Sequence, residues 1–285
     1  MRILKKALIL LMTGGVMMTS ACAATDADSS KKVTEPEEAS SMDTTTTAAE
    51  EEAVTTTAPE VTTEPFTYTT EPFRPVEEYG KVIAITFDDG PNTSTTNEVL
   101  DVLEEYGVVA SFFVIGTNIN EDTVPVMQRA VTMGCEINSH SMTHSYMNSM
   151  KDDEILAEIE SVNELIVGAV GREPAFFRAP YLATSGKMFQ LIETPFIAGY
   201  GCNDWDPAVD VETRVQQTLE QCSDGAIILL HDAEGNSQTV EALRQIIPQL
   251  LDEGYELVTV SELFHAKEFP IIAGLKQQFS TVARD

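Results

Sequence analysis

Basic residues are scarce in this sequence of 285 residues, which has 17 Lys and Arg against 46 Asp and Glu and a formal net charge of −29. Proteins that bind nucleic acids need clustered Lys and Arg to neutralise phosphates, so this charge argues against a nucleic-acid partner. The excess of acidic residues does not identify a substrate, because an acidic surface also keeps a protein soluble.

The N-terminal apolar run is also short. It covers residues 7–18, and its 12 residues are too few to span a bilayer, which takes about 20. Basic residues precede this run and small residues follow it at Ser20 and Ala21, which is the pattern of an export signal. We therefore predict a signal sequence over residues 1–22 and an exported protein.

The end of this signal has two interpretations. Residues 19–22, Thr-Ser-Ala-Cys, resemble a bacterial lipobox, although Leu is usual where Thr19 stands. Cys22 would then carry lipid and hold the protein on the membrane, facing the cell exterior, as its only attachment there. Ala21-Cys22-Ala23 also fits an ordinary signal-peptidase site, which would release a secreted protein.

Cysteine is scarce as well. Cys22 belongs to the signal, and the rest of the chain has three: Cys135, Cys202 and Cys222. An odd number does not indicate a disulfide framework. Because free cysteine is among the most buried residue types, we expect these three to be buried thiols.

The segment 23–78 lacks the residues from which a core is built. Between residues 24 and 78 there is no Gly, Leu or Ile, while 14 Thr and 14 Asp or Glu are present against three basic residues, a balance of −11. Such a segment cannot bury enough apolar surface to offset the entropy of ordering, and its like charges and prolines extend it. We predict a disordered, acidic, Thr-rich linker.

From residue 79 onward apolar runs alternate with helical patterns. The strand-like runs lie at 81–87, 108–115, 135–139, 175–178, 196–201, 225–231 and 256–260. The helix-like stretches lie at 93–106, 121–133, 151–169, 186–193, 211–221 and 237–253. This alternation predicts one α/β domain over residues 79–285 with a parallel sheet. Periodicity alone does not show whether the sheet closes into a barrel.

Histidine is rare, with four residues in all, and three of them follow predicted strands. His140 and His144 come after the third predicted strand, and His231 ends the sixth. Four other polar residues also lie at or just after strand ends: Asp88, Asp89, Arg178 and Asp204. Active sites of parallel α/β folds assemble at this end of the strands, so we expect these residues to form one site.

Five segments, in order, resemble the motifs of the NodB-type polysaccharide deacetylases, carbohydrate esterase family 4. They are Thr-Phe-Asp-Asp-Gly-Pro at 86–91, His-Ser-Met-Thr-His at 140–144, Arg-Ala-Pro-Tyr at 178–181, Asp-Trp at 204–205 and Leu-Leu-His-Asp at 229–232. The resemblance covers residues 81–265 and is specific through the combination, since His-x-x-x-His alone is a weak signal. It implies a distorted (β/α)7-type barrel, here preceded by the signal sequence and the linker.

By this resemblance Asp89, His140 and His144 bind a divalent metal, with zinc the expected ion and cobalt or another ion an alternative. Two histidines and one carboxylate leave coordination positions open for water and substrate. The metal would polarise the acetyl carbonyl and lower the pKa of its bound water. Asp88 is then the implied general base.

The same resemblance assigns the remaining roles. His231 would protonate the leaving amine or alkoxide, and a nearby carboxylate would hold its imidazole in the required tautomer. The backbone N–H of Tyr181, next to Pro180, would stabilise the oxyanion. The family pairs the Arg of the third motif, here Arg178, with an Asp of the fourth, here Asp204.

Two departures from the family pattern leave questions open. Leu182 stands where the family has Gly or Asn, which would reshape the wall of the cleft. In the fourth motif Asp204 fills the family position, but a shift of register would place Asp206 there. Trp205, the only Trp of the chain, would either floor the acetyl pocket or pack in the core.

The implied function is removal of acetyl groups from an extracellular polysaccharide by a monomeric enzyme. The first hypothesis is N-deacetylation of N-acetylglucosamine units in peptidoglycan or a surface glycan. The second is O-deacetylation, as in acetylxylan esterases, and no single residue separates the two. A third hypothesis, a catalytically inactive glycan-binding protein, is disfavoured because all three expected metal ligands are present.

Overall fold

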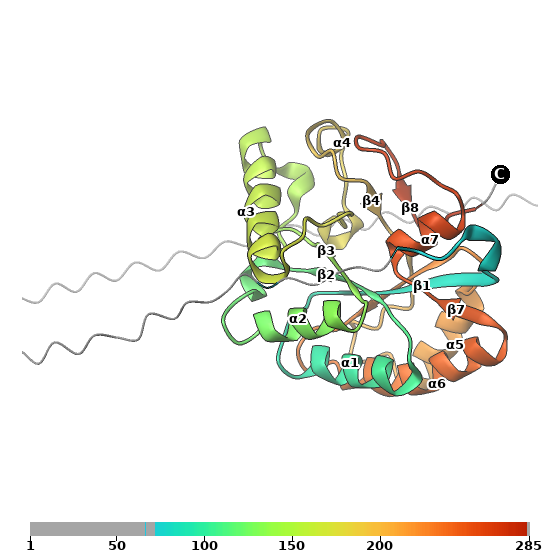
Figure 1. Cartoon of the computed structure of the whole chain (residues 1–285). Coiled ribbons are helices and arrows are strands. Elements are labelled where there is room, and N and C mark those ends of the chain that lie inside the picture. Colours follow the sequence, from blue (N-terminus) through green and yellow to red (C-terminus); the bar gives the residue numbers. More distant parts are fainter. Residues whose placement is uncertain (1–65, 67–71, 284–285) are drawn as a thin grey trace, which may run out of the picture. The chain divides into compact units, whose positions relative to one another are not determined.

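The computed structural model describes residue 66 and residues 72–283 (Figure 1). The predicted signal sequence with Cys22, and most of the predicted linker, lie outside these residues. Within the described part, strands and helices alternate from residue 81 to residue 266, except that the helices at 152–170 and 188–191 are consecutive, as are the strands at 196–197 and 200–201. No described helix is both long and apolar enough to cross a membrane.

The central strand is β1 (Lys81–Asp88), in which every residue after Lys81 is buried. A strand covered on both faces has a continuous apolar sequence instead of an alternating one, which is why it was visible in the sequence. It pairs in parallel with β2 (Ser111–Val114) and β6 (Ile227–His231). Next to these lie β3 (Glu136–Ser139) and β5 (Tyr200–Gly201), while β7 (Tyr255–Leu257) pairs with the first residues of β1.

Single-residue bridges extend the sheet towards a barrel. Phe177 pairs in parallel with Ser139 of β3 and with Phe196 of β4 (Phe196–Ile197), which also pairs with β8 (Gln278–Phe279). Two residues after β4 the chain enters β5, which pairs with β6. The predicted α/β class with a parallel sheet is therefore confirmed, and the single residue Phe177 bridges β3 to β4.

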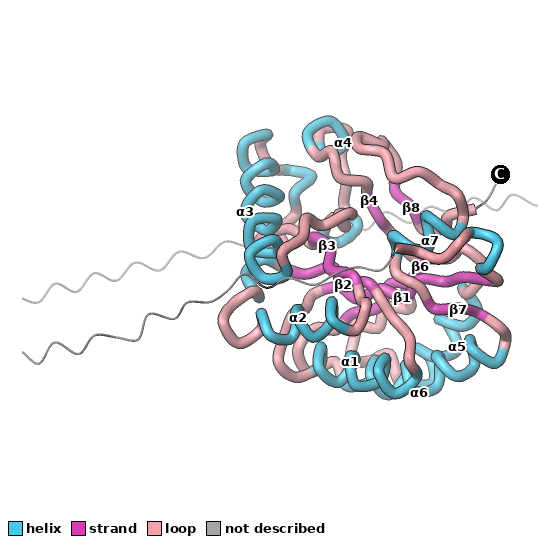
Figure 2. The backbone as a smooth tube through the Cα atoms, viewed as in Figure 1, coloured by secondary structure: helices cyan, strands magenta, loops and turns pink. Residues whose placement is uncertain are grey.

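The helices surround the sheet in the order of the strands. They are α1 (Thr95–Tyr106), α2 (Val124–Thr132), α3 (Asp152–Val170), α4 (Met188–Leu191), α5 (Val211–Gln221), α6 (Ser237–Asp252) and α7 (Val260–Ala266). Short 3₁₀ turns lie at Val76–Glu78, Gly116–Asn118, Met147–Ser149 and Pro180–Leu182. Neighbouring helices pack as α5-α6-α1-α2-α3-α4, and Figure 2 shows α1, α2, α5 and α6 along one side of the strands.

Two predicted strands differ from the structure. The strand expected at 175–178 is reduced to the bridging residue Phe177. The strand expected at 196–201 is split at Gly199, whose φ of 138° favours glycine and where a Cβ would lie 2.9 Å from Leu229 Cβ. α7 and β8 were not predicted, because elements this short carry too few residues for a periodic pattern.

Residues 72–80 pack against β7 and α7. The guanidinium of Arg74 forms an ion pair of 2.6 Å with Glu256 and lies 4.2 Å from the ring centre of Tyr79. His265 Nε2 is 2.8 Å from the carbonyl oxygen of Arg74, and the Tyr79 hydroxyl donates to Glu262 at 2.8 Å. Residues 72–78, which composition places in the predicted linker, therefore contact the domain through a few aromatic and charged side chains.

The three cysteines of the described part are free thiols, as expected, with Cys135 and Cys202 buried and Cys222 half-buried. Burial raises the pKa of Cys135 to about 12, and burial together with the charge of Glu253 does the same for Cys222. Since only the thiolate reacts, an alkylating reagent at pH 8 should label both roughly a thousandfold more slowly in the folded protein than in denaturant. Mass spectrometry of the cysteine peptides over time measures this, and rapid labelling of Cys135 in the folded protein would contradict it.

Candidate metal centre and active site

The structure brings polar residues from separate strand ends to one edge of the sheet. Asp88 and His231 are the last residues of β1 and β6 and are register partners. His140 follows β3, and Arg178 follows the bridging residue Phe177. Parallel strands deliver these side chains to one place because all their carboxyl ends face the same way.

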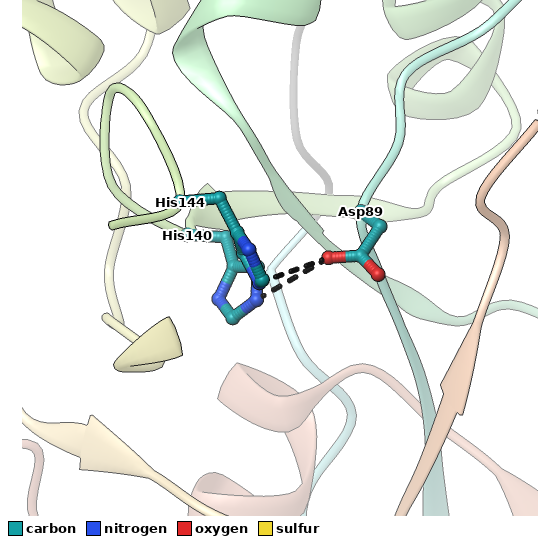
Figure 3. Close-up of side chains that lie close together, drawn as sticks. All are labelled: Asp89, His140 and His144. Carbon is teal, nitrogen blue, oxygen red and sulfur yellow. Dashed lines mark ion pairs between the residues drawn. The ribbon is translucent and has the colours of Figure 1, made fainter. Parts of the chain in front are cut away.

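Asp89, His140 and His144 form a cluster whose ligand atoms all lie within 4.8 Å of one another. Asp89 Oδ1 is 3.6 Å from His140 Nε2 and 3.3 Å from His144 Nε2, and Figure 3 shows both rings directed at this carboxylate. His140 Nδ1 lies 2.8 Å from the carbonyl oxygen of Arg178, so Nδ1 carries the proton and the Nε2 lone pair faces Asp89. Asp89 Oδ1 is buried and has no hydrogen-bond donor among the described residues.

These atoms fit a divalent cation. A lone pair of His140 opposite a buried carboxylate oxygen is repulsive unless a positive charge lies between them. Two imidazoles and one carboxylate suit zinc or a neighbouring transition metal and leave positions open for other ligands. The hydrogen bond from His140 to a backbone carbonyl orients the ring, as is usual for metal-binding histidines.

Unusual backbone conformations aim the ligands. Asp89 has φ 77° and His144 φ 57°, both in the left-handed region that costs a non-glycine residue on the order of 1 kcal/mol or more. Local hydrogen bonds hold them there. The Asn118 amide donates to the Asp89 carbonyl at 2.8 Å, and the His144 N–H donates to Ser141 Oγ at 3.0 Å.

Asp88 forms a buried ion pair with Arg178. Arg178 Nη1 donates to Asp88 Oδ1 at 2.5 Å, and its guanidinium lies 4.0 Å from the ring centre of Phe113. Burial alone would raise the pKa of Asp88, but the charges of Arg178, His140 and His231 outweigh it and hold the pKa below its usual value. Asp88 is therefore ionised at neutral pH. The expected pairing of Arg178 with Asp204 is wrong, because the side chain turns towards β1.

Asp204 instead holds His231. Its Oδ1 accepts from His231 Nδ1 and its Oδ2 from the His231 backbone N–H, both at 2.8 Å. A carboxylate only accepts, so the proton sits on Nδ1 and Nε2 is directed away from Asp204. Asp204 has no solvent exposure, whereas the Asp206 side chain accepts from the Ala208 N–H, so of the two it is Asp204 that contacts His231.

Exposed aromatic rings border the metal cluster. Tyr181, in the turn after Pro180, has φ 59° and packs on His144 with 4.6 Å between ring centres. Tyr146 stacks on Tyr181 at 3.9 Å and an angle of 14°. Trp205 is 61% exposed, so the alternative that it packs in the core is wrong. Tyr146 was missed in the sequence, where only its position two residues after His144 pointed to it.

Asp232 is a second residue whose role the sequence did not reveal. Its Oδ1 accepts from the Gly90 N–H at 3.0 Å and its Oδ2 from the Thr96 hydroxyl at 2.6 Å. Burial, with the nearby charges of Asp89 and Asp88, raises its pKa to about 7. A Cβ at Gly90 would lie 2.4 Å from Asp232 Oδ2, so glycine is required for this contact, which fixes the turn that carries the acidic pair.

Comparisons with known proteins agree with this geometry. The family model described as Polysaccharide deacetylase matches residues 76–194. The peptidoglycan-N-acetylglucosamine deacetylase of Bacillus cereus is 36% identical over 196 residues, which are 66% of this chain and 90% of that protein. The chain belongs to the polysaccharide deacetylase family.

Two further proteins similar to this chain have xylan in their names. The bifunctional xylanase/deacetylase of Pseudobutyrivibrio xylanivorans is 49% identical over 187 residues, which are 66% of this chain but only 31% of that longer protein. The structure of a family 4 acetyl xylan esterase from Clostridium thermocellum in complex with a cobalt ion superposes with a TM-score of 0.70 at 41% identity. The superposition covers 71% of this chain and 99% of the esterase chain.

The titration of His231 tests the arrangement around Asp204. Burial lowers its pKa, but the hydrogen bond and charge of Asp204, with the charges of Asp88 and Asp89, raise it to about 9. In the metal-free protein the His231 imidazole should therefore stay protonated through neutral pH and lose its proton near pH 9. In Asp204→Asn only burial and weaker attractions remain, so its pKa should fall by at least two units.

The measurement is an NMR pH titration of the imidazole carbon-bound protons, with the signal assigned by its absence in His231→Gln. A midpoint near pH 6.5 in the unsubstituted protein would show that Asp204 does not control this imidazole.

Proposed function

We propose that this protein is an exported, divalent-metal-dependent hydrolase that removes acetyl groups from a polysaccharide. The observation that carries the proposal is the Asp89-His140-His144 cluster with the buried carboxylate of Asp88 beside it and the imidazole of His231 on the adjacent strand. Metal-dependent hydrolysis of an acyl bond requires a metal site with a general base and a general acid beside it.

Asp89, His140 and His144 would hold the ion. When bound, a divalent ion acts as a Lewis acid towards the acetyl carbonyl and makes a water molecule more acidic, and zinc is our first candidate with cobalt as an alternative. Asp88 accepts the proton of the attacking water. Its Oδ1 is occupied by Arg178, so Oδ2, which lies 3.6 Å from His140 Nε2, faces the cluster and takes the proton.

His231 delivers a proton to the leaving nitrogen or oxygen from Nε2, because Asp204 occupies Nδ1. Tyr181 contributes its backbone N–H to the developing oxyanion, with Pro180 and Trp205 in the wall that receives the acetyl group. The exposed rings of Tyr146 and Tyr181 offer apolar faces with polar edges, surfaces on which sugar rings pack.

Two substrate classes are proposed. The first is the N-acetyl group of N-acetylglucosamine units, supported by the peptidoglycan deacetylase of Bacillus cereus at 36% identity. The second is the O-acetyl group of xylan, supported by the greater identity, 49% and 41%, to a xylanase/deacetylase and to an acetyl xylan esterase. A protonated His231 suits an amine leaving group, which must be protonated, and also serves an alkoxide.

The location follows from the sequence. We propose that residues 1–22 direct export and that Cys22 carries lipid, which would make the anchor the protein's only contact with a membrane. The acidic segment that follows would let the domain reach polysaccharide beyond the membrane as a monomer.

Acetate release tests the function. The protein loaded with zinc or cobalt should release acetate from N-acetylglucosamine oligosaccharides and peptidoglycan strands, or from acetylated xylo-oligosaccharides, and chelation should abolish the release. Release from xylan fragments alone would establish the second substrate class. No release from any of these substrates by metal-loaded, folded protein would overturn the proposed function.

The adjacent residues Asp88 and Asp89 should have separable roles. Asp88→Asn retains an oxygen that accepts from Arg178, but its amide is no base, so it should keep bound metal while kcat falls roughly 10²- to 10⁴-fold. Asp89→Asn should lose bound metal, and its kcat should recover in part when metal is added in excess. Elemental analysis beside kcat measures both.

Asp206→Asn is the matched control, because Asp206 lies two residues after Asp204 and contacts neither the metal cluster nor His231 among the described residues. It should keep metal and turnover. Loss of metal in Asp88→Asn but not in Asp89→Asn would reverse the assignment, and near-normal turnover of Asp88→Asn would place the base elsewhere.

A further inference from the structure

Arg214 is a buried charge that the chemistry above does not use. It lies in the first turn of α5 and is 1% exposed. Among the described residues it has no ion pair, unlike the buried Arg178 with its carboxylate partner. Burying a guanidinium is costly unless its N–H groups are hydrogen-bonded, so the groups that accept from it indicate what it holds in place.

Those acceptors lie in two segments next to His231. Nε donates to the Val209 carbonyl at 2.8 Å and Nη2 to the Asp206 carbonyl at 3.1 Å, in the loop that carries Asp204. Nη1 donates to Asn236 Oδ1 at 2.6 Å and to Thr239 Oγ1 at 2.8 Å, at the start of α6. One planar side chain therefore ties the loop to the helix.

The direction of the bonds through Thr239 is forced. Arg214 can only donate, so the Thr239 oxygen accepts from it and must donate its single proton elsewhere. That proton goes to Asp204 Oδ2 at 2.7 Å, which as a carboxylate oxygen only accepts. Asp204 in turn accepts from Nδ1 and the backbone N–H of His231. Arg214 therefore donates to Thr239 and Thr239 donates to Asp204. The Asp204 carboxylate also accepts the two hydrogen bonds from His231.

A second route reaches the same residue from the backbone. With its Oδ1 turned to Arg214, Asn236 directs its Nδ2 to the carbonyl oxygen of His231 at 2.9 Å. Arg214 thus restrains the main chain of His231 through Asn236 and the carboxylate partner of its ring through Thr239. Thr239 is 1% exposed and Asp204 fully buried, so water does not replace these bonds.

We propose that Arg214 and Thr239 are positioning residues that orient the imidazole of His231 so that Nε2 delivers its proton to the leaving group. The proposal rests on the proposed function in taking His231 as the general acid. It does not involve the metal ligands, which lie after β1 and β3.

Thr239→Val removes the hydroxyl and keeps the shape of the side chain. It should lower kcat about 10- to 100-fold, the cost of a catalytic group displaced by about an ångström, with little change in KM or metal content. Thr239→Ser restores the hydroxyl and should restore kcat. Thr218→Val is the matched control, because Thr218 is also a buried threonine, on α5, whose hydroxyl contacts the Cys202 sulfur at 3.5 Å and, among the described residues, forms no hydrogen bond with Arg214, Asp204 or His231.

An NMR measurement tests the network without any substrate. The Nδ1 proton of His231 should give a downfield signal in the unsubstituted protein, in Thr239→Ser and in Thr218→Val, and it should broaden or disappear by exchange with water in Thr239→Val. This result stands even if the proposed acetylated substrates are not the natural ones. An unchanged Nδ1 signal together with unchanged kcat in Thr239→Val would overturn the proposal.

Arg214→Lys gives an independent test if Thr239→Val does not fold. Lysine keeps the positive charge, but its ammonium cannot reach four acceptors spread around a planar fork. Its kcat should fall like that of Thr239→Val. Where both single variants fold, the kcat of the double variant should be no lower than that of the less active single variant, because both residues act through Asp204. Full turnover in Arg214→Lys, or multiplicative losses in the double variant, would contradict a shared role.

Discussion

The site depends on the way Arg178 binds two strands at once. Its guanidinium pairs with Asp88 at the end of β1, its N–H donates to Ser139 in β3, and its carbonyl accepts from the ring of His140. Arg178 and the Asp88 side chain are almost fully buried, so neither charge is stable there without the other. Removing the arginine side chain would leave the buried Asp88 carboxylate without its ion-pair partner, next to the His140 ring that the same residue's carbonyl orients.

Strand ends and their polar residues could be predicted from the sequence because a buried parallel strand is a continuous apolar run with an abrupt end. The partner of each side chain could not. Arg178 was expected beside Asp204, yet its guanidinium pairs with Asp88 at the end of β1. The stack of Tyr146 on Tyr181 was equally hidden, since it joins two loops whose conformations follow from packing and not from periodicity.

Strain is concentrated at the same edge. Four non-glycine residues at or beside the metal cluster have positive φ: Asp89, Ser141, His144 and Tyr181. A positive φ is uncommon outside glycine, and although Asp and His adopt it more often than other residues, this preference is too weak to locate such positions from the sequence. It persists because the sheet below is tightly packed and local hydrogen bonds fix each turn, and it is retained where side chains must converge on one point.

Asp88 and His231, the base and the acid of the proposed function, are each linked to a buried arginine, Asp88 directly and His231 through other side chains. Arg178 contacts Asp88 directly, which keeps that carboxylate ionised and lowers its pKa. Arg214 contacts Asp204 only through the Thr239 hydroxyl. The hydrogen bond and charge of Asp204, with the charges of Asp88 and Asp89, raise the pKa of His231 to about 9. Direct contact between Arg214 and Asp204 would neutralise that carboxylate and lower the pKa of His231. In the arrangement we propose, the Thr239 hydroxyl orients the imidazole through Asp204 while Arg214 itself stays out of contact with that carboxylate.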